Sequence, residues 1–166
     1  MLKYVFAAVV LLLCQPVWAE EIKIGFVNVA RVLQQAPQAE KAKKRLEREF
    51  APRDKRLVAM QKELQKLEEK LARDAAVMSD SERRKLEREI LAKQRELKRA
   101  REEFREDFNL RRNEELGKLQ RQVFEAIKSL AKEESYDLLL TDGVVYASDK
   151  VDVTAKILKR LQDLAK

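Results

Sequence analysis

The side chains available for chemistry in this 166-residue chain are almost all lysine, arginine, aspartate and glutamate. The chain has 36 basic and 29 acidic residues, no histidine and a single cysteine, Cys14. With no histidine and a single cysteine, the inventory nearly excludes zinc sites, thiol nucleophiles and histidine acid–base pairs. The sequence also has no glycine-rich phosphate loop. The composition therefore predicts a protein that is not an enzyme and that uses no cofactor and no metal.

Surface charge is the chemistry that remains. Basic clusters such as Arg83-Arg84-Lys85 alternate with glutamates, as on a solvated helix face. The net charge of the whole chain is +7. Such a balance favours acidic partners, whether polypeptide, anionic lipid or nucleic acid. Because charged residues make up 39% of the chain while glycine and proline number three each, long solvated helices must carry these groups.

Residues 1–19 have the pattern of a cleaved secretory signal peptide. Lys3 precedes an apolar run over residues 5–13, and small residues stand at the expected cut after Ala19. The run is too short to cross a bilayer core of about 30 Å, which disfavours a retained membrane anchor. A lipoprotein through Cys14 is disfavoured by the bulky Leu13. Removing Lys3 leaves 35 basic against 29 acidic residues, a net charge of +6, and no cysteine.

A short strand is predicted directly after the signal peptide. Ile22, Ile24 and Phe26 alternate with other residues, as on a strand with one buried face. Asn28 is placed to cap a short helix that ends at Gln35.

A second strand region is predicted near the C-terminus. The dipeptide Asp142-Gly143 separates two apolar runs, residues 136–141 and 144–147, which indicates a β-hairpin. Asp152 is expected to cap a final amphipathic helix. The apolar positions of that helix are Val153, Ile157, Leu158, Leu161 and Leu164.

Residues 38–132 read as two long helical runs joined by a tip near residues 75–82. The first run extends from Gln38 to Met78 and is kinked or broken at most once, by Pro52. Its apolar residues alternate steps of three and four, which predicts a narrow coiled-coil seam made of Leu57, Met60, Leu64, Leu67 and Leu71. The second run extends from Ser81 to about Lys132, and Ser79 and Glu82 have capping-box spacing.

Two runs of similar length favour an antiparallel helical hairpin, which we call the arm. The seam residues are expected to join its helices, although a client groove is an alternative. Phe104 and Phe108 are expected to pack within the arm. Ala75, Val77 and Met78 at the tip either close the hairpin or form the first apolar surface that a client meets.

The predicted fold class is therefore α+β, with an arm at residues 38–132 on a small β body at residues 20–37 and 133–166. So small a body leaves too much surface exposed to be stable alone, so the subunits are expected to complete one another's sheet by oligomerising. The body residues expected at that contact are Ile22, Ile24, Phe26, Leu138, Leu140 and Val145.

The order of these elements resembles the periplasmic chaperones of the Skp/OmpH type. The resemblance rests on four segments: Lys23-Ile24-Gly25-Phe26-Val27-Asn28, Val32-Leu33-Gln34-Gln35, Arg111-Arg112-Asn113-Glu114-Glu115-Leu116-Gly117-Lys118-Leu119 and Asp152-Val153-Thr154-Ala155. It implies a periplasmic homotrimer whose three arms surround a cavity. It also implies that the chain binds unfolded outer-membrane proteins without ATP and keeps them soluble before membrane insertion. The glycine-free tip and Pro52 depart from the family pattern.

The same resemblance points to Arg111 and Arg112 as a contact for an anionic lipid such as lipopolysaccharide. Salt bridges from this pair to Glu114 or Glu115 would explain it equally well. Two other functions fit a basic coiled coil. A nucleic-acid binder is disfavoured by the signal peptide and by the lack of interleaved aromatic residues. A periplasmic spacer or adaptor would instead have a saturated apolar seam and one defined partner.

Overall fold

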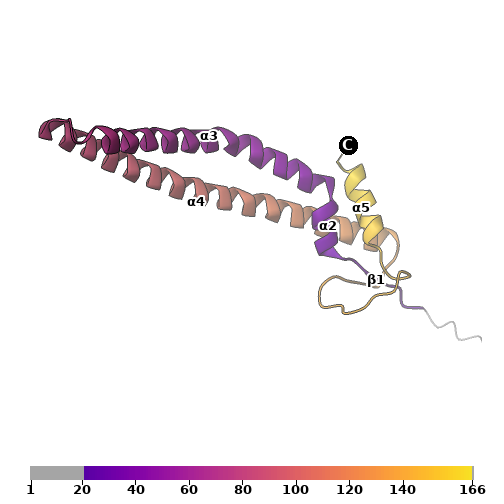
Figure 1. Cartoon of the computed structure of the whole chain (residues 1–166). Helices are drawn as coiled ribbons and strands as arrows, with labels where there is room; N and C mark the ends of the chain where they lie inside the picture. Colours follow the sequence, from indigo (N-terminus) through magenta and orange to yellow (C-terminus); the bar gives the residue numbers. More distant parts are fainter. Residues whose placement is uncertain (1–20, 166) are drawn as a thin grey trace, which may run out of the picture.

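The computed structural model describes residues 21–165 and consists of a long helical hairpin on a small body (Figure 1). Helices α3 (Pro37–Asp74) and α4 (Asp80–Glu133) form the arm. The body contains β1 (Ile24–Phe26), α2 (Val29–Gln35), β2 (Leu138–Leu140) and α5 (Thr154–Asp163). The predicted α+β fold class with a helical-hairpin arm is confirmed. The signal peptide predicted for residues 1–19 lies outside the described residues.

The body sheet has two parallel strands, with Ile24 paired to Leu138 and Phe26 to Leu140. Because parallel neighbours need a crossover connection, the whole arm lies between the two strands in the chain. Gly25 permits this close pairing, since a Cβ atom there would lie 2.5 Å from the Leu139 side chain. The other edge of β1 bonds the segment before α5 through Phe26, whose N–H donates to the Val151 carbonyl over 2.7 Å.

The β-hairpin predicted around Asp142-Gly143 is wrong for the described chain, because residues 144–147 form no strand. The chain does turn at this dipeptide, since Gly143 has a positive φ of +76°. β2 pairs with β1 instead, and the run after the turn extends outward with Val145 fully exposed. The apolar residues of that run therefore have no strand to pair with in a single chain.

Within the described chain, β1 buries the face opposite to Ile22 and Ile24. Val27 is completely buried, whereas Ile22 and Ile24 are 69% and 44% exposed. Gly25 shares the inward face, where only a residue without a side chain fits against Leu139. The larger apolar residues of the strand therefore point out of the subunit.

The core of the body lies where β1, α2, α4 and α5 meet. Its completely buried members are Val27, Val32, Val123, Thr154, Ile157 and Leu161. Asn28 caps α2 as predicted, by accepting from the Arg31 N–H. Val153, not Asp152, is the N-cap of α5. Asp152 still accepts a hydrogen bond from the Thr154 N–H over 2.8 Å, with the two-residue reach of a capping side chain but from one position before the N-cap.

The arm begins at Pro37, which needs no N–H at the first helical position. α3 continues unbroken through Pro52 even though a proline leaves one carbonyl of the preceding turn without a donor. At the tip, Ser79 and Glu82 form the predicted capping box, with the Ser79 N–H donating to Glu82 over 3.0 Å. Among the described helices, none has both the length and the apolar composition needed to cross a bilayer.

Candidate functional site

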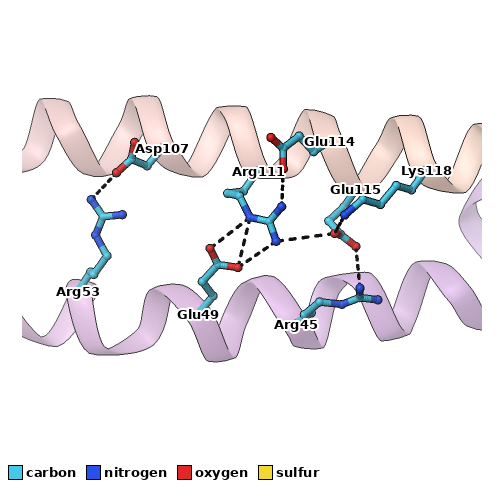
Figure 2. Close-up of polar contacts among 8 residues, drawn as sticks. All are labelled: Arg45, Glu49, Arg53, Asp107, Arg111, Glu114, Glu115 and Lys118. Atoms are coloured by element: carbon cyan, nitrogen blue, oxygen red, sulfur yellow. Dashed lines mark hydrogen bonds and ion pairs between the residues drawn. The ribbon is translucent and has the colours of Figure 1, made fainter.

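Charged groups connect the two helices in the lower arm, the part nearer the body (Figure 2). Glu115 of α4 is only 5% exposed, yet it carries a carboxylate. Its oxygens lie 2.9 Å from Lys118, 3.6 Å from Arg45 and 3.8 Å from Arg111. Those three cations are themselves 28–51% exposed, so Glu115 is the only deeply buried member of this set. A buried charge is tolerated when it is paired in this way.

The pKa of Glu115 is lowered from its ordinary value. The hydrogen bond from Lys118 is the largest cause, and the charges of Arg45, Lys118 and Arg111 add to it against the opposing effect of burial. Glu115 is therefore an anion at neutral pH. It holds cations from both helices of the arm.

The Arg111 side chain is bonded to carboxylates of its own chain. Its guanidinium donates to Glu49 across the arm, with Nε 3.2 Å from Oε1, and also to Glu114 on the same helix. These hydrogen bonds, first to Glu49 and then to Glu114, raise the pKa of Arg111. Glu49, which comes from the other helix, is a partner that the sequence did not suggest.

Arg112 differs from its neighbour. It is exposed and forms no ion pair with any residue between 21 and 165. Its side chain lines an apolar hollow of about 390 Å³ between α3 and α4. The apolar lining includes Leu33, Leu46, Phe108, Leu116 and Leu119, and the charged residues Lys43, Glu47 and Glu115 also line the hollow. An unpaired cation therefore lies beside apolar surface.

Three phenylalanines pack between α3 and α4, on the tip side of the ion pairs around Glu115. The Phe50 ring lies 5.5 Å from Phe104 and 5.2 Å from Phe108, edge to face in both cases. The prediction that Phe104 and Phe108 pack within the arm is confirmed. Phe50, which is 4% exposed, was not among the predicted seam residues, which begin at Leu57. Arg53 lies over the Phe50 ring and bonds Asp107 over 2.7 Å.

The other residues that the sequence singled out lie in the distal arm, which is the part of the arm between these rings and the tip. Leu64 is buried with Leu86, Ile90 and Leu97 of α4. Leu57, Met60, Leu67 and Leu71 pack against this cluster, and so does Met78 from the tip. At the tip itself Val77 is 86% exposed, whereas Ala75 is half-buried.

The outward face of the body sheet is apolar. The large apolar side chains exposed there are Ile24, Leu138 and Leu140. Ile22, just before β1, and Val145, in the run after Gly143, are exposed as well. All five belong to the set that the sequence suggested for subunit contact. Phe26, the sixth, is half-buried. No residue of the described chain covers this face.

A long antiparallel helical hairpin projecting from a small α+β body defines a class of proteins with a coiled-coil arm. Residues 23–161 match the model of the family described as outer membrane protein (OmpH-like). This chain belongs to the OmpH-like family.

Two relatives are both named chaperone protein Skp. The one from Yersinia pseudotuberculosis is 46% identical over 141 residues and the one from Yersinia enterocolitica 34%. In each case the match covers 84% of this chain and 86% of the relative. The crystal structure of an OmpH-like protein from Caulobacter crescentus has the same fold, with a TM-score of 0.77 at 12% identity over 87% of this chain and 86% of that one.

Proposed function

We propose that this chain is an ATP-independent periplasmic chaperone, which binds unfolded outer-membrane β-barrel proteins and prevents their aggregation before membrane insertion. Its relatives carry the name of a chaperone, and the family model that matches is described as outer membrane protein (OmpH-like). The observation that carries the proposal is the shape of the arm. A narrow apolar seam joins two long helices, and charged side chains cover the remaining surface.

The outward sheet face supports assembly into a trimer through residues 20–37 and 133–166. Soluble monomers rarely expose a contiguous apolar patch of this kind. Val145 and its neighbours in the unpaired run after Gly143 offer backbone groups that another subunit's sheet could bond. Three arms, residues 38–132 of each subunit, would then surround a space for the client.

Client binding would arise from many weak contacts. Lysine and arginine stems present apolar surface while their charged ends stay in water. Each contact contributes well under about 1 kcal/mol, but three arms acting on one client raise the total affinity. Val77 and Ala75 at the tip are candidate apolar contacts. Release would follow when the folded barrel becomes the more stable state of the client.

The test is dilution of a urea-unfolded outer-membrane protein into buffer with and without this chain. We expect the chain to suppress turbidity and to sediment with the client as one complex. The variant Leu138→Asp, which places a charge on the outward sheet face, should weaken both assembly and protection. The exposed arm variant Leu91→Asp is its matched control and should retain both. Turbidity that persists with the unmodified chain would disprove the chaperone function.

The hollow beside Arg112 supports a second proposed contact, for an anionic lipid such as lipopolysaccharide. A phosphate would meet the guanidinium of Arg112 and an acyl chain the apolar lining. Arg111 would act mainly by orienting this region, since its own charge is used by Glu49 and Glu114.

Lipopolysaccharide binding of Arg112→Glu should fall about tenfold or more, as expected for the loss of one charge-assisted hydrogen bond and its replacement by a repulsive charge. Arg84→Glu, an exposed arginine near the tip, changes the net charge equally and should leave binding within about twofold. Equal losses in the two variants would show that only the overall charge matters.

A further inference from the structure

Gly117 lies in the interior of α4, where a glycine costs about 1 kcal/mol relative to alanine. No close packing within the chain accounts for it. A Cβ atom at this position would meet only the Arg121 side-chain end, at an ordinary contact distance of 3.6 Å. The gap that glycine leaves on the helix surface is therefore available to something outside the chain.

The face of α4 that carries Gly117 points away from α3. Polar residues lie three and four positions from the glycine on this face, and large apolar residues lie seven positions from it. The buried residues Glu115 and Leu119 lie two positions on either side of Gly117, which is about 200° around the helix axis. Leu110 and Phe124 lie seven residues before and after it and share its face. They are 60% and 46% exposed. We call Leu110, Gly117 and Phe124 the outer stripe.

Charges beside the outer stripe are arranged symmetrically about Gly117. Glu106 lies eleven residues before it and Lys128 eleven residues after it, so an acid and a base occupy equivalent distances. Closer to the centre, Glu114 lies three residues before Gly117 and Arg121 four residues after it, and Glu114 already pairs with Arg111 of its own helix. Glu106 and Arg121 form no ion pair with any described residue, whereas Lys128 contacts only the exposed Glu125.

We propose that the outer stripe is a contact between two copies of this chain, with their α4 helices antiparallel and a two-fold axis at Gly117. An antiparallel pair centred there places Leu110 of each copy level with Phe124 of the other. The same register sets Glu106 opposite Lys128, and Glu114 next to Arg121. A two-fold contact requires this self-complementarity, in which residue i meets j and j meets i. The heptad spacing indicates that the partner surface is also a helix, and the two glycines let the backbones approach closely.

This contact is separate from the proposed trimer. Subunits around a three-fold axis present different faces to each other, so a two-fold contact joins subunits from two different bodies. The outward sheet face and the outer stripe lie on different elements, which allows both to be used at once. The inference therefore concerns association between assemblies, and it holds or fails independently of the chaperone function.

Disulfide cross-linking tests the two-fold axis directly. The test uses the full chain carrying Cys14→Ser and Gly117→Cys. The proposed contact would bring the two Cα atoms of residue 117 within the separation of about 4.4–6.8 Å that a disulfide needs. Ala92→Cys is the control, since Ala92 is exposed on the same helix but has no counterpart helix in this register. We expect rapid dimer formation under mild oxidation for Gly117→Cys alone. Equal rates for the two variants would overturn the proposal.

Charge reversal provides a test that leaves Gly117 unchanged. Glu106→Lys or Lys128→Glu alone would set like charges opposite each other twice per contact and should weaken association between assemblies at least about fivefold. The double variant restores opposite charges and should recover association to within about twofold. Sedimentation velocity of the full chain over a concentration series measures this. Single variants that associate like the unmodified chain, or a double variant that stays weak, would contradict the antiparallel register.

Discussion

Helices α3 and α4 contact each other through different side chains in the distal arm and in the lower arm. Near the tip, Leu64 of α3 packs against Leu86, Ile90 and Leu97 of α4. Nearer the body, the contacts between helices include the Phe50 ring cluster and then ion pairs around Glu115. The helices lie close together toward the tip and diverge toward the body, where the long arginine side chains extend between them (Figures 1 and 2).

Because of this difference, salt and pH should affect the helix pairing differently in the two parts of the arm. Apolar packing depends little on salt or on pH. Ion pairs depend on both, because exposed charges are screened and carboxylates titrate. The distal arm, where the leucine cluster is accompanied by the Lys93–Glu63 ion pair, should therefore hold its pairing over a wider range of conditions than the junction with the body, which should loosen first in acid.

The largest effect is expected for Leu64→Ala in the distal arm. Truncating this buried leucine should lower the free energy of unfolding by about 2–4 kcal/mol, since the arm is thin and has no second layer to fill the cavity. Denaturant unfolding measures the loss, and hydrogen exchange should show it in the distal arm first. Val58→Ala, at an exposed position on the same helix, is the control. Similar losses in both variants would show that the distal seam is not where the stability lies.

Glu115→Gln tests the lower arm and should have a smaller effect, about 1–2 kcal/mol. The amide keeps some hydrogen bonds but removes the charge that three cations share, and their partial exposure limits the loss. Glu125→Gln removes an exposed carboxylate that also pairs with a lysine, and it should change stability by less than about 0.5 kcal/mol.

The stability that the Glu115 charge contributes should depend on pH in a definite direction. The pKa of Glu115 is lower in the folded chain than in the unfolded one, so its stabilisation is complete above the unfolded value of about 4.5. This stabilisation is lost as pH falls through the folded pKa. The stability difference between the unmodified chain and Glu115→Gln should therefore be largest at neutral pH and shrink below about pH 4.5. A difference that stays constant down to pH 3 would mean that the charge is not what matters.

The smallest effect is expected at the tip, for Ser79→Ala. Loss of the capping side chain should cost about 1 kcal/mol, confined to the first turn of α4. It should also raise the pKa of Glu82, which hydrogen bonds to Ser79 now lower. Titration followed by nuclear magnetic resonance can measure this. An unchanged Glu82 pKa would show that the capping box does not persist in solution.

The arm could be read from the sequence because its signals are local. Leucines at steps of three and four and the capping box each act through neighbours within about two turns. Pro52 is harder to read, since its cost depends on whether the freed carbonyl is exposed. The resemblance to the family added the order of the elements along the chain, which no single motif gives.

Glu115 was not predicted as a buried residue because glutamate in a charged helix normally faces water. A signal was available. Phe108, Glu115 and Leu119 follow one another at steps of seven and four, so Glu115 occupies a place where the seam residue of an apolar arm would stand. Arg45, the cation of α3 that helps to make this tolerable, comes from about 70 residues earlier in the chain.

The body was less predictable because its pairings are distant. Asp142-Gly143 favours a local hairpin, but β2 bonds a strand more than 100 residues away. The face that β1 buries depends on Leu139 and Tyr136, which crowd Gly25 from the far end of the chain. Alternation alone gives the period of a strand and does not say which side is covered.

The position of the arm between β1 and β2 has a consequence for how the chain folds. Lys23 and Asp137, which bond each other beside the sheet, are 114 residues apart. In an unfolded chain, closing so long a loop carries a large entropic cost before any sheet contact can offset it. An antiparallel hairpin returns the chain to its starting point, so once α3 and α4 have paired the two strands are already close neighbours. The arm thereby acts as an internal guide for assembly of the body that bears it.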